Sequence, residues 1–266
     1  MIIQEWIRPK HVAEAYEAFT NEDRKAVLFG GGAWLKLTHK QIDLAIDLQD
    51  CVKSEIEVKE HMISMGAMTP LEGITTHPYL NELASGILPQ ACKVVMGPSL
   101  RNVATIGGTI MGKYGFSDVI PVLLAFDAIL QFHKHGNVWL REFLESGLDS
   151  KDILTHVLIP KDPAIGYFHS MKKTALDFSI LNIAIYKTPQ MDKIAIGARP
   201  QIAIRAYQAE NLLNEADVID EAFLQEVVQQ ITLECKVGGN QAASQEYRTQ
   251  LLQTLAMRGL KEVYHL

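Results

Sequence analysis

The sequence has few cysteines and no cysteine motif. Its 266 residues include Cys51, Cys92 and Cys235, which lie far apart in the chain. Iron–sulfur clusters and tetrahedral zinc sites need closely spaced sets of such ligands, so we expect neither within this chain. An odd, sparse set of thiols also fits a reducing compartment.

Long apolar runs are also missing. No run reaches the roughly 18 uncharged apolar residues that a membrane helix needs. The first residues, MIIQEW, lack the basic region and apolar run of a secretory signal. We therefore expect a cytoplasmic protein that does not enter a membrane.

Positive charge is in short supply as well. The chain has 25 Lys and Arg residues against 31 Asp and Glu residues, which gives a formal net charge of -6. A general positive field that would attract nucleic acid is therefore not expected. An anionic cofactor would have to be held by local backbone N–H groups, which directs attention to the glycines.

Hydrophobic residues make up 48% of the chain, enough for a large core. The first part reads as a mixed α/β domain over residues 1–162, with subdomains 1–54 and 55–162. Its periodicity predicts strands at 2–7, 26–29, 44–48, 56–58 and 61–66, helices at 12–19, 79–91 and 119–127, a helix directly after a glycine turn at 30–32, and a hairpin at 128–140.

The second part follows a proline-bearing stretch near residue 160 and covers residues 163–266. Strands are predicted at 166–172, 180–187 and 193–198, and helices at 206–213, 221–231 and 246–263. Strands followed by helices indicate an α+β domain with a three-stranded antiparallel sheet. The fold class expected for the whole chain is α+β.

The sharpest local feature is the string AVLFGGGAWL at residues 26–35, an apolar strand that runs into three glycines. Glycine permits positive φ and close backbone approach, so successive N–H groups can point at a pyrophosphate. A tight strand-to-helix turn without any ligand is the alternative for this motif taken alone.

A second cluster, NVATIGGT at residues 102–109, places small polar and apolar residues around a glycine pair. It fits a second phosphate loop or a plain surface turn. Two glycine loops joined by an α/β body favour a dinucleotide lying between them. The Rossmann fingerprint is missing, because no Gly-x-Gly-x-x-Gly occurs with an acidic residue about 20 positions later.

The second cluster carries a resemblance to a known family. The strings RNVATIGGTI at 101–110 and SDVIPVLLAFDA at 117–128 resemble the signature of the FAD-binding subunits of xanthine dehydrogenase, carbon monoxide dehydrogenase and related molybdenum hydroxylases. The resemblance extends in order from FGGGAWL at 29–35 to EYR at 246–248. It implies a two-part FAD-binding domain of the PCMH type, followed by the family's C-terminal domain.

Carried over by position, the resemblance implies FAD as the cofactor, held by both loops and three further residues. Backbone N–H groups in the loops would bind the diphosphate without any arginine. The implied contacts are Phe29, Gly30, Gly31, Gly32, Ala33, Trp34, Leu35, Thr105, Ile106, Gly107, Gly108, Thr109, Asp118, Leu154 and Lys172.

For three of these residues, the sequence fits a structural role without FAD as well as a contact to FAD. Asp118 fits either a contact to FAD or the N-cap of the helix that follows it. Lys172, one of two adjacent lysines, fits either a flavin contact or a solvated side chain. Trp34 fits either stacking on a cofactor ring or packing in the core.

The sequence departs from the family pattern at both loops. Ala33 and Trp34 stand where the first loop usually has a polar pair, and Thr109 stands where asparagine is common. The basic residues often found after the lysine are missing beyond Lys173, which weakens the case for a nicotinamide nucleotide as the electron acceptor.

The resemblance implies an oxidoreductase subunit that passes electrons from iron–sulfur clusters on a small partner chain to NAD or another acceptor. A large partner chain would carry the molybdopterin. We expect no catalytic acid or base and no metal site in this chain, because a flavin itself accepts and releases electrons. The alternatives are a flavin-free assembly protein that retains the fold and a stand-alone flavin oxidoreductase.

Overall fold

The computed structural model describes residues 1–21 and 23–266, and these residues form two compact units. The units follow packing rather than chain order, so the domain division expected at residue 162 stays a prediction. The first unit comprises Met1–Gly73, Pro98–Gly112 and Ala128–Pro160, and the second comprises Ile74–Gly97, Lys113–Asp127 and Lys161–Leu266.

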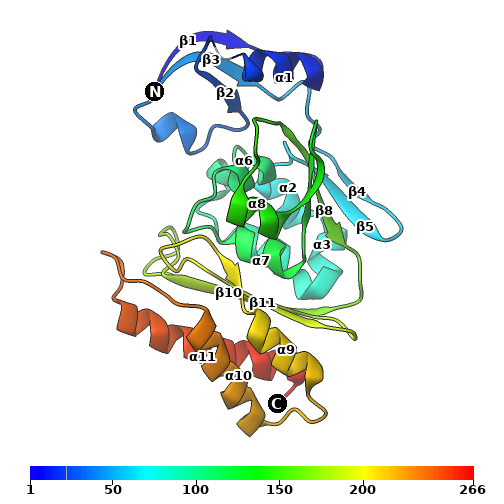
Figure 1. The fold of residues 1–266 in the computed structure, drawn as a ribbon, viewed down its shortest axis with the longest axis vertical. Coiled ribbons are helices and arrows are strands. Elements are labelled where there is room, and N and C mark those ends of the chain that lie inside the picture. Colours follow the sequence, from blue (N-terminus) through cyan, green and yellow to red (C-terminus); the bar gives the residue numbers. More distant parts are fainter. Residues whose placement is uncertain (22) are drawn as a thin grey trace. The chain divides into compact units, whose positions relative to one another are not determined.

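The first unit begins with a small parallel sheet in the order β1-β3-β2. Its strands are β1 (Ile2–Ile7), β3 (Gln41–Asp47) and β2 (Ala26–Phe29), and α1 (Val12–Thr20) packs on β2 and β3 (Figure 1). The central β3 is the most buried strand, since both of its edges are paired. The carboxyl end of β2 leads directly into the glycines.

The same unit contains an antiparallel sheet in the order β4-β5-β8-β6-β7. The predicted hairpin is present, and Gly136 supplies its positive φ of 68°. Helix α6 packs on β8. The elements are β4 (Ile56–Val58), β5 (Met62–Gly66), β8 (Leu154–Pro160), β6 (Ile129–Phe132), β7 (Gly136–Trp139), α5 (Pro98–Arg101), α6 (Ile106–Met111) and α8 (Leu140–Ser146), while α2 (Leu71–Thr76) spans the junction of the units.

The second unit is built on an antiparallel sheet in the order β12-β11-β10-β9. The predicted strands are confirmed as β9 (Ile165–Met171), β10 (Leu181–Lys187) and β11 (Asp192–Gly197). The expectation of three strands is wrong for the described residues, because the short β12 (Ile204–Arg205) pairs with β11. Two residues between turns leave too little sequence for a strand pattern. The α+β fold class is confirmed.

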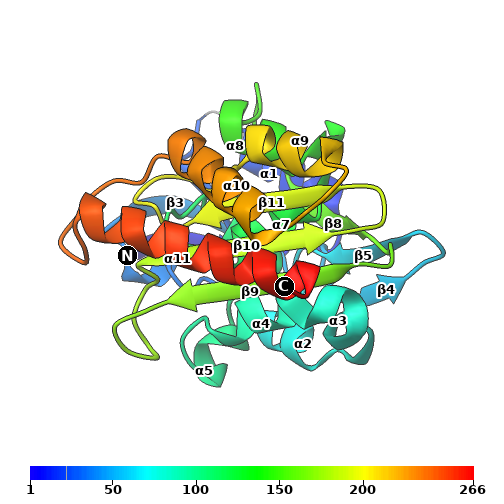
Figure 2. The ribbon, with the colours of Figure 1, turned by 90° about the horizontal axis from the view of Figure 1, so that it is seen from below.

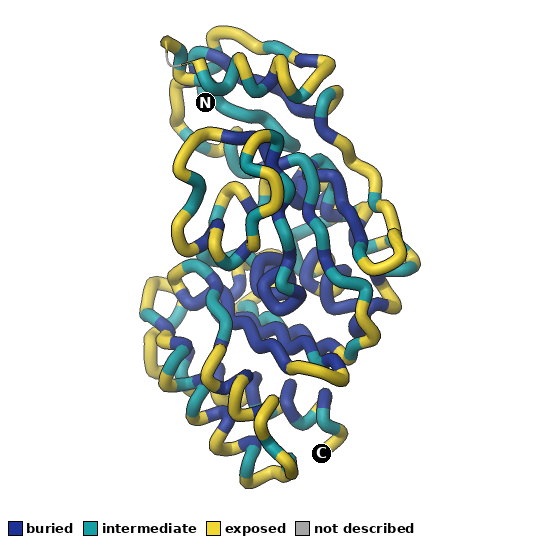
Figure 3. Tube along the Cα trace, turned by 45° about the vertical axis from the view of Figure 1, so that its right-hand side comes forward, coloured by how far each residue is buried: buried dark blue, intermediate teal, exposed yellow. Residues whose placement is uncertain are grey.

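Helices cover both faces of this sheet. On one face lie α9 (Tyr207–Glu215), α10 (Glu221–Glu234) and α11 (Gln245–Tyr264), as Figure 2 shows. On the other lie α4 (Ile87–Lys93) and α7 (Val119–Ala125). Strands β10 and β11 are therefore buried along almost their whole length (Figure 3), which explains their nearly continuous apolar sequence.

The helix expected over residues 79–91 is divided into pieces. The structure has α3 (Pro78–Glu82), the 3-10 turn η2 (Leu83–Gly86) and then α4. Ala84, Ser85 and Gly86 adopt left-handed backbone conformations between them. The restart at Ile87 places Pro89 in the first turn of α4, where a proline needs no N–H partner. An apolar period alone cannot show such a break.

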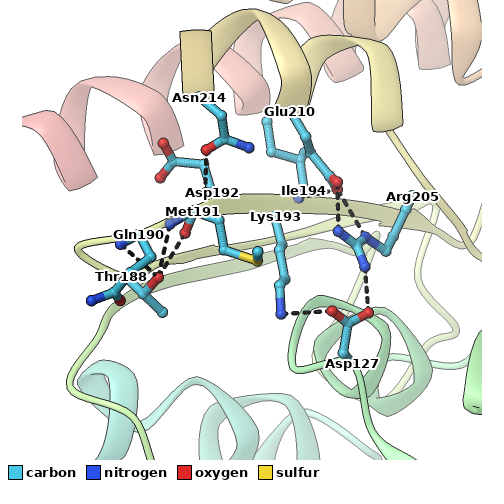
Figure 4. A network of polar contacts seen from close by, with 10 residues as sticks. All are labelled: Asp127, Thr188, Gln190, Met191, Asp192, Lys193, Ile194, Arg205, Glu210 and Asn214. Carbon is cyan, nitrogen blue, oxygen red and sulfur yellow. Dashed lines mark hydrogen bonds and ion pairs between the residues drawn. The ribbon is translucent and has the colours of Figure 1, made fainter.

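A buried polar network links four elements of the second unit (Figure 4). The Lys193 ammonium lies 2.6 Å from Asp127, and Arg205 also pairs with Asp127. Arg205 donates to the two Glu210 carboxylate oxygens from Nε and Nη2, at 3.0 and 2.6 Å. The network thus holds two positive and two negative side chains, so each buried charge has an opposite partner.

The Arg248 side chain of α11 is 1% exposed and fixes the loop that precedes this helix. Its guanidinium donates to the carbonyl oxygens of Ile180, Gly238 and Ala243 at 2.7–2.9 Å, and to the Asn240 side chain at 2.7 Å. One residue thereby joins the start of β10 to the loop at 238–243.

Replacing Arg248 with methionine should lower the free energy of unfolding by about 3 kcal/mol, because buried carbonyl acceptors lose a charged donor. Arg258→Met, on the exposed side of the same helix, should change it by less than about 0.5 kcal/mol. Denaturant unfolding of both variants measures the difference. Equal effects would contradict the anchoring role.

Candidate functional site

The first glycine loop begins after Phe29, the last residue of β2. The Phe29 carbonyl accepts a hydrogen bond from Leu48 N, just after β3, at 3.0 Å. Of its glycines, Gly32 adopts a positive φ of 65°. A Cβ at Gly32 would lie 2.3 Å from the Phe29 ring, so glycine is needed there both for conformation and for space. The helix expected after the loop is a single 3-10 turn, η1 (Leu35–Leu37), which ends at exposed residues.

The loop presents a row of unpaired donors. Within residues 1–21 and 23–266, the backbone N–H groups of Gly30, Gly31, Gly32 and Ala33 have no hydrogen-bond acceptor. Successive free amides in a turn can converge on an anion, and the left-handed Gly32 supplies such a turn. The structure therefore fits the predicted phosphate loop at this position.

The second glycine cluster forms the start of α6, and the amides of Ile106 to Thr109 are already bonded. Ile106 N donates to Thr69 O and Gly107 N to Ala67 O, each at 2.9 Å. Thr105 caps the helix, because its Oγ1 accepts from Gly108 N at 3.1 Å. Thr109 N donates to Thr105 O at 2.9 Å, so these four amides are not available to a phosphate in this conformation.

Gly107 is required for close packing rather than for an unusual φ. A Cβ at this position would lie 2.7 Å from Ala67 O and 2.8 Å from Ala67 Cβ. The second cluster thus supplies a tightly packed wall. Of the second-loop amides expected to bind phosphate, those of Ile106 to Thr109 are bonded within the protein, whereas Thr105 N–H has no acceptor among residues 1–21 and 23–266.

The two loops touch each other. A Cβ added to Gly31 would lie 1.3 Å from Val103 O, and one added to Gly30 would lie 3.1 Å from Thr105 Oγ1. Glycine therefore allows the backbones to meet. The structure brings together predicted residues that are about 75 positions apart in the sequence.

Two cavities adjoin this meeting point within the first unit. The first, which we call the apolar cavity, has a volume of about 270 Å³. The second, the aromatic cavity, has a volume of about 420 Å³. Gly30, Met68 and Thr105 line both. The apolar cavity is also lined by Leu28, Leu48, Gly107, Gly108, Met111 and Leu154, and the aromatic cavity by Trp6, Phe29, Gly31, Gln49, Asn102 and Val103.

Leu154, the predicted contact farthest along this unit, is held by a polar cluster just before β8. The buried Asp152 accepts from the N–H groups of Lys134 and His135 at 2.9 and 2.8 Å. Asp152 also accepts from Ile153 N at 2.7 Å and contacts His135 Nδ1 at 2.7 Å, and His135 Nε2 lies 2.7 Å from Asp149. The bonds to Asp152 and Asp149 raise the pKa of His135. The segment entering β8 is thereby fixed to the β6–β7 turn.

Asp118 and Lys172 lie in the second unit, whereas both loops lie in the first. The Asp118 carboxylate accepts from Ser170 at 2.9 Å, from Asn182 at 2.8 Å and from Ser179. Lys172 Nζ is 3.0 Å from Asp118 and 2.6 Å from Val94 O. Lys172 is therefore not a solvated lysine.

Asp118 precedes α7, but its side chain does not cap the helix. The cap is Ser117, whose Oγ accepts from Ile120 N at 3.2 Å. The half-buried Trp34 stands at the start of η1. As contacts to FAD, all three positions, Trp34, Asp118 and Lys172, stay predictions.

Several residues of the site escaped the sequence analysis. Leu28, Leu48, Met68 and Met111 line the apolar cavity but read as ordinary core residues. Met111 could have been predicted, because it lies one helical turn after Gly107 and Gly108 and so shares their face of α6.

In the part of the chain that the structure describes, no group of three or more His, Cys, Asp or Glu side chains is arranged to hold a metal ion. No helix among residues 1–21 and 23–266 is both long and apolar enough to cross a membrane. The cavities beside the first loop are therefore the strongest candidate for a functional site.

Comparison with known proteins addresses what such a site binds. Residues 2–162 match the family model described as FAD binding domain in molybdopterin dehydrogenase. Residues 166–263 match the model described as CO dehydrogenase flavoprotein C-terminal domain.

Curated relatives agree in length. The protein named uncharacterized protein YgfM of Escherichia coli strain K12 is 27% identical over 225 residues, which cover 83% of this chain and 84% of that protein. The putative xanthine dehydrogenase FAD-binding subunit XdhB of the same strain is 24% identical over 285 aligned positions, covering 96% and 94%.

The fold itself has a close counterpart among solved structures. A chain of reconstituted CO dehydrogenase from Oligotropha carboxidovorans superposes with a TM-score of 0.88 at 20% identity, covering 99% of this chain and 98% of that one. The expected resemblance and the expected cofactor are confirmed. Because the first family model covers more than half of the residues, the chain belongs to the FAD-binding subunits of the molybdopterin-dependent dehydrogenases, a family of oxidoreductases, and its cofactor is FAD.

Proposed function

We propose that the N–H groups of Gly30 to Ala33 bind the diphosphate of FAD in an electron-transfer subunit. The observation that carries this proposal is the row of amides without acceptors in the described chain, placed beside two cavities. Bonds from amides to a charged acceptor contribute about 1.5–3 kcal/mol each, so such a row can hold a diphosphate without arginine.

The apolar cavity suits the adenine end of FAD. It is lined mostly by apolar atoms, and its volume of about 270 Å³ accommodates a flat purine. Gly30 belongs to its wall, so a ring in this cavity stays next to the diphosphate donors. Leu154, Thr105, Gly107 and Gly108 would then contact the nucleotide through packing.

The isoalloxazine ring, in contrast, has to remain accessible to electron donors and acceptors. When bound, FAD supplies a ring that accepts and releases electrons, while the protein supplies position and electrostatics. Asp118 and Lys172 remain proposed contacts to FAD, Asp118 to its ribose or adenine groups and Lys172 to the flavin edge or the phosphate. Phe29, Trp34, Leu35, Ile106 and Thr109 complete the proposed set with the residues that flank the two loops.

The proposed donor to this subunit is an iron–sulfur small chain, itself supplied by a molybdopterin-bearing large chain. The name of one relative, a xanthine dehydrogenase FAD-binding subunit, supports a multi-chain complex. The three cysteines are consistent with clusters on another chain, since Cys92 and Cys235 are buried and the residues lie far apart. The proposed acceptor is NAD or another soluble carrier, and the proposed location is the cytoplasm.

Gly30→Val should weaken FAD binding at least tenfold, because its methyl groups would enter both cavities. A Cβ there would lie 3.1 Å from Thr105 Oγ1, which must shift by a few tenths of an ångström, and 3.7 Å from Met68 Sδ, so the unfolding midpoint of the apoprotein is measured alongside the affinity. Gly238→Val is the matched control, because its Cβ would meet only Arg199 O at 3.7 Å. Fluorescence titration of the apoprotein with FAD gives both affinities.

Normal FAD affinity in Gly30→Val would remove the first loop from the cofactor site. A wild-type chain that stays colourless and cannot be loaded with FAD would instead favour the flavin-free assembly protein. The retained row of amides favours loading.

The acceptor is tested on the loaded chain by itself. After photochemical reduction of the flavin without oxygen, NAD should restore the absorbance of the oxidised flavin within seconds. If NAD has no effect while an artificial one-electron acceptor restores it, the acceptor is not a nicotinamide nucleotide. Turnover of an organic substrate without any partner chain would favour the stand-alone oxidoreductase.

A further inference from the structure

An exposed tryptophan stands beside the first glycine loop. Trp6 lies on β1, an edge strand of the small sheet, and 45% of its surface is exposed. Its ring meets the Phe29 ring edge to face, with centroids 4.7 Å apart and an interplanar angle of 60°. β3 runs between their strands, with Trp6 opposite Ala45 and Phe29 opposite Asp47.

The Phe29 ring in turn lies against Gly32. The space that a Cβ of Gly32 would occupy is filled by Phe29 Cε1 and Cζ, at 2.3 and 2.4 Å. Gly32 has the left-handed φ of 65° that turns the loop. A chain of contacts therefore runs from Trp6 through Phe29 to the residue that sets the direction of the amides.

The residues of β2 line different cavities. Ala26, Val27 and Leu28 line the apolar cavity, whereas Phe29, the last residue of the strand, lines the aromatic cavity together with Trp6. The Trp6–Phe29 pair thus supports the loop from the aromatic cavity, whereas the residues before Phe29 line the proposed adenine cavity.

We propose that Trp6 is a positioning residue for the diphosphate loop: it holds the Phe29 ring over Gly32 and so keeps the amides of Gly30 to Ala33 aligned. This rests on the proposed function of those amides. Trp6 itself does not touch FAD.

Trp6→Ala should raise the dissociation constant of FAD about two- to tenfold, the range that corresponds to the loss of one edge-to-face aromatic pair. Trp6→Phe, which keeps an aromatic edge at Phe29, should restore affinity to within about twofold of wild type. Ile2→Ala, at a more exposed position of the same strand, is the control and should bind FAD normally.

A double-mutant cycle separates positioning from direct contact. If Trp6 acts through Phe29, then Trp6→Ala combined with Phe29→Leu should weaken FAD binding no further than Phe29→Leu does. Direct stacking of Trp6 on a cofactor ring would make the two losses multiply. Unfolding midpoints of the apoproteins, measured in parallel, report any loss of stability.

The proposal is overturned if Trp6→Ala binds FAD as wild type does, if Trp6→Phe fails to restore affinity, or if the losses multiply. Gly30→Val distinguishes this failure from failure of the proposed function. When Gly30→Val loses FAD and Trp6→Ala does not, the loop is correct and the role of Trp6 is wrong. When both bind FAD normally, the loop itself is wrongly assigned.

Discussion

The site depends on four successive backbone N–H groups that have no acceptor among residues 1–21 and 23–266. They are the N–H groups of Gly30 to Ala33, and they are available to water or to an anionic ligand. Small residues make this possible, because the left-handed turn at Gly32 and the contact of Gly31 with Val103 O exclude a side chain. A chain of net charge -6 can thus hold an anion by local geometry.

Other segments of the first unit surround the amides of Gly30 to Ala33. The start of α6 contributes a wall whose own amides are used up by Thr69, Ala67 and Thr105. The Asp152–His135 cluster fixes the entry into β8 and with it Leu154. Donors, wall and cavity therefore come from different segments, and each segment is fixed by its own hydrogen bonds.

The sequence predicted the parts of this arrangement that depend on local patterns. Apolar periods and turn residues predicted the strand before the first glycines, the β6–β7 hairpin and the strands β9 to β11. The break at Ala84 and Ser85 was not, because their left-handed conformations have no glycine signal before Gly86. Nor was β12, a two-residue strand defined by its pairing with β11.

The sequence predicted which two loops meet at the candidate site, but not which of their amides are free. Gly107 looked like a phosphate contact, yet its glycine is explained by close packing on Ala67. Which amides are free depends on tertiary hydrogen bonds such as Ile106 N to Thr69 O, which no local pattern reveals. The partners of Asp118 on Ser170, Ser179 and Asn182 are likewise set by strand pairing far along the chain.

Hydrogen exchange resolved to single amides, recorded with and without FAD, tests the central claim most directly. The amides of Gly30 to Ala33 should exchange fast in the apoprotein and become protected when FAD binds, whereas those of Ile106 to Thr109 should be protected in both states. Protection that appears at 106–109 while 30–33 keep exchanging fast would contradict the account.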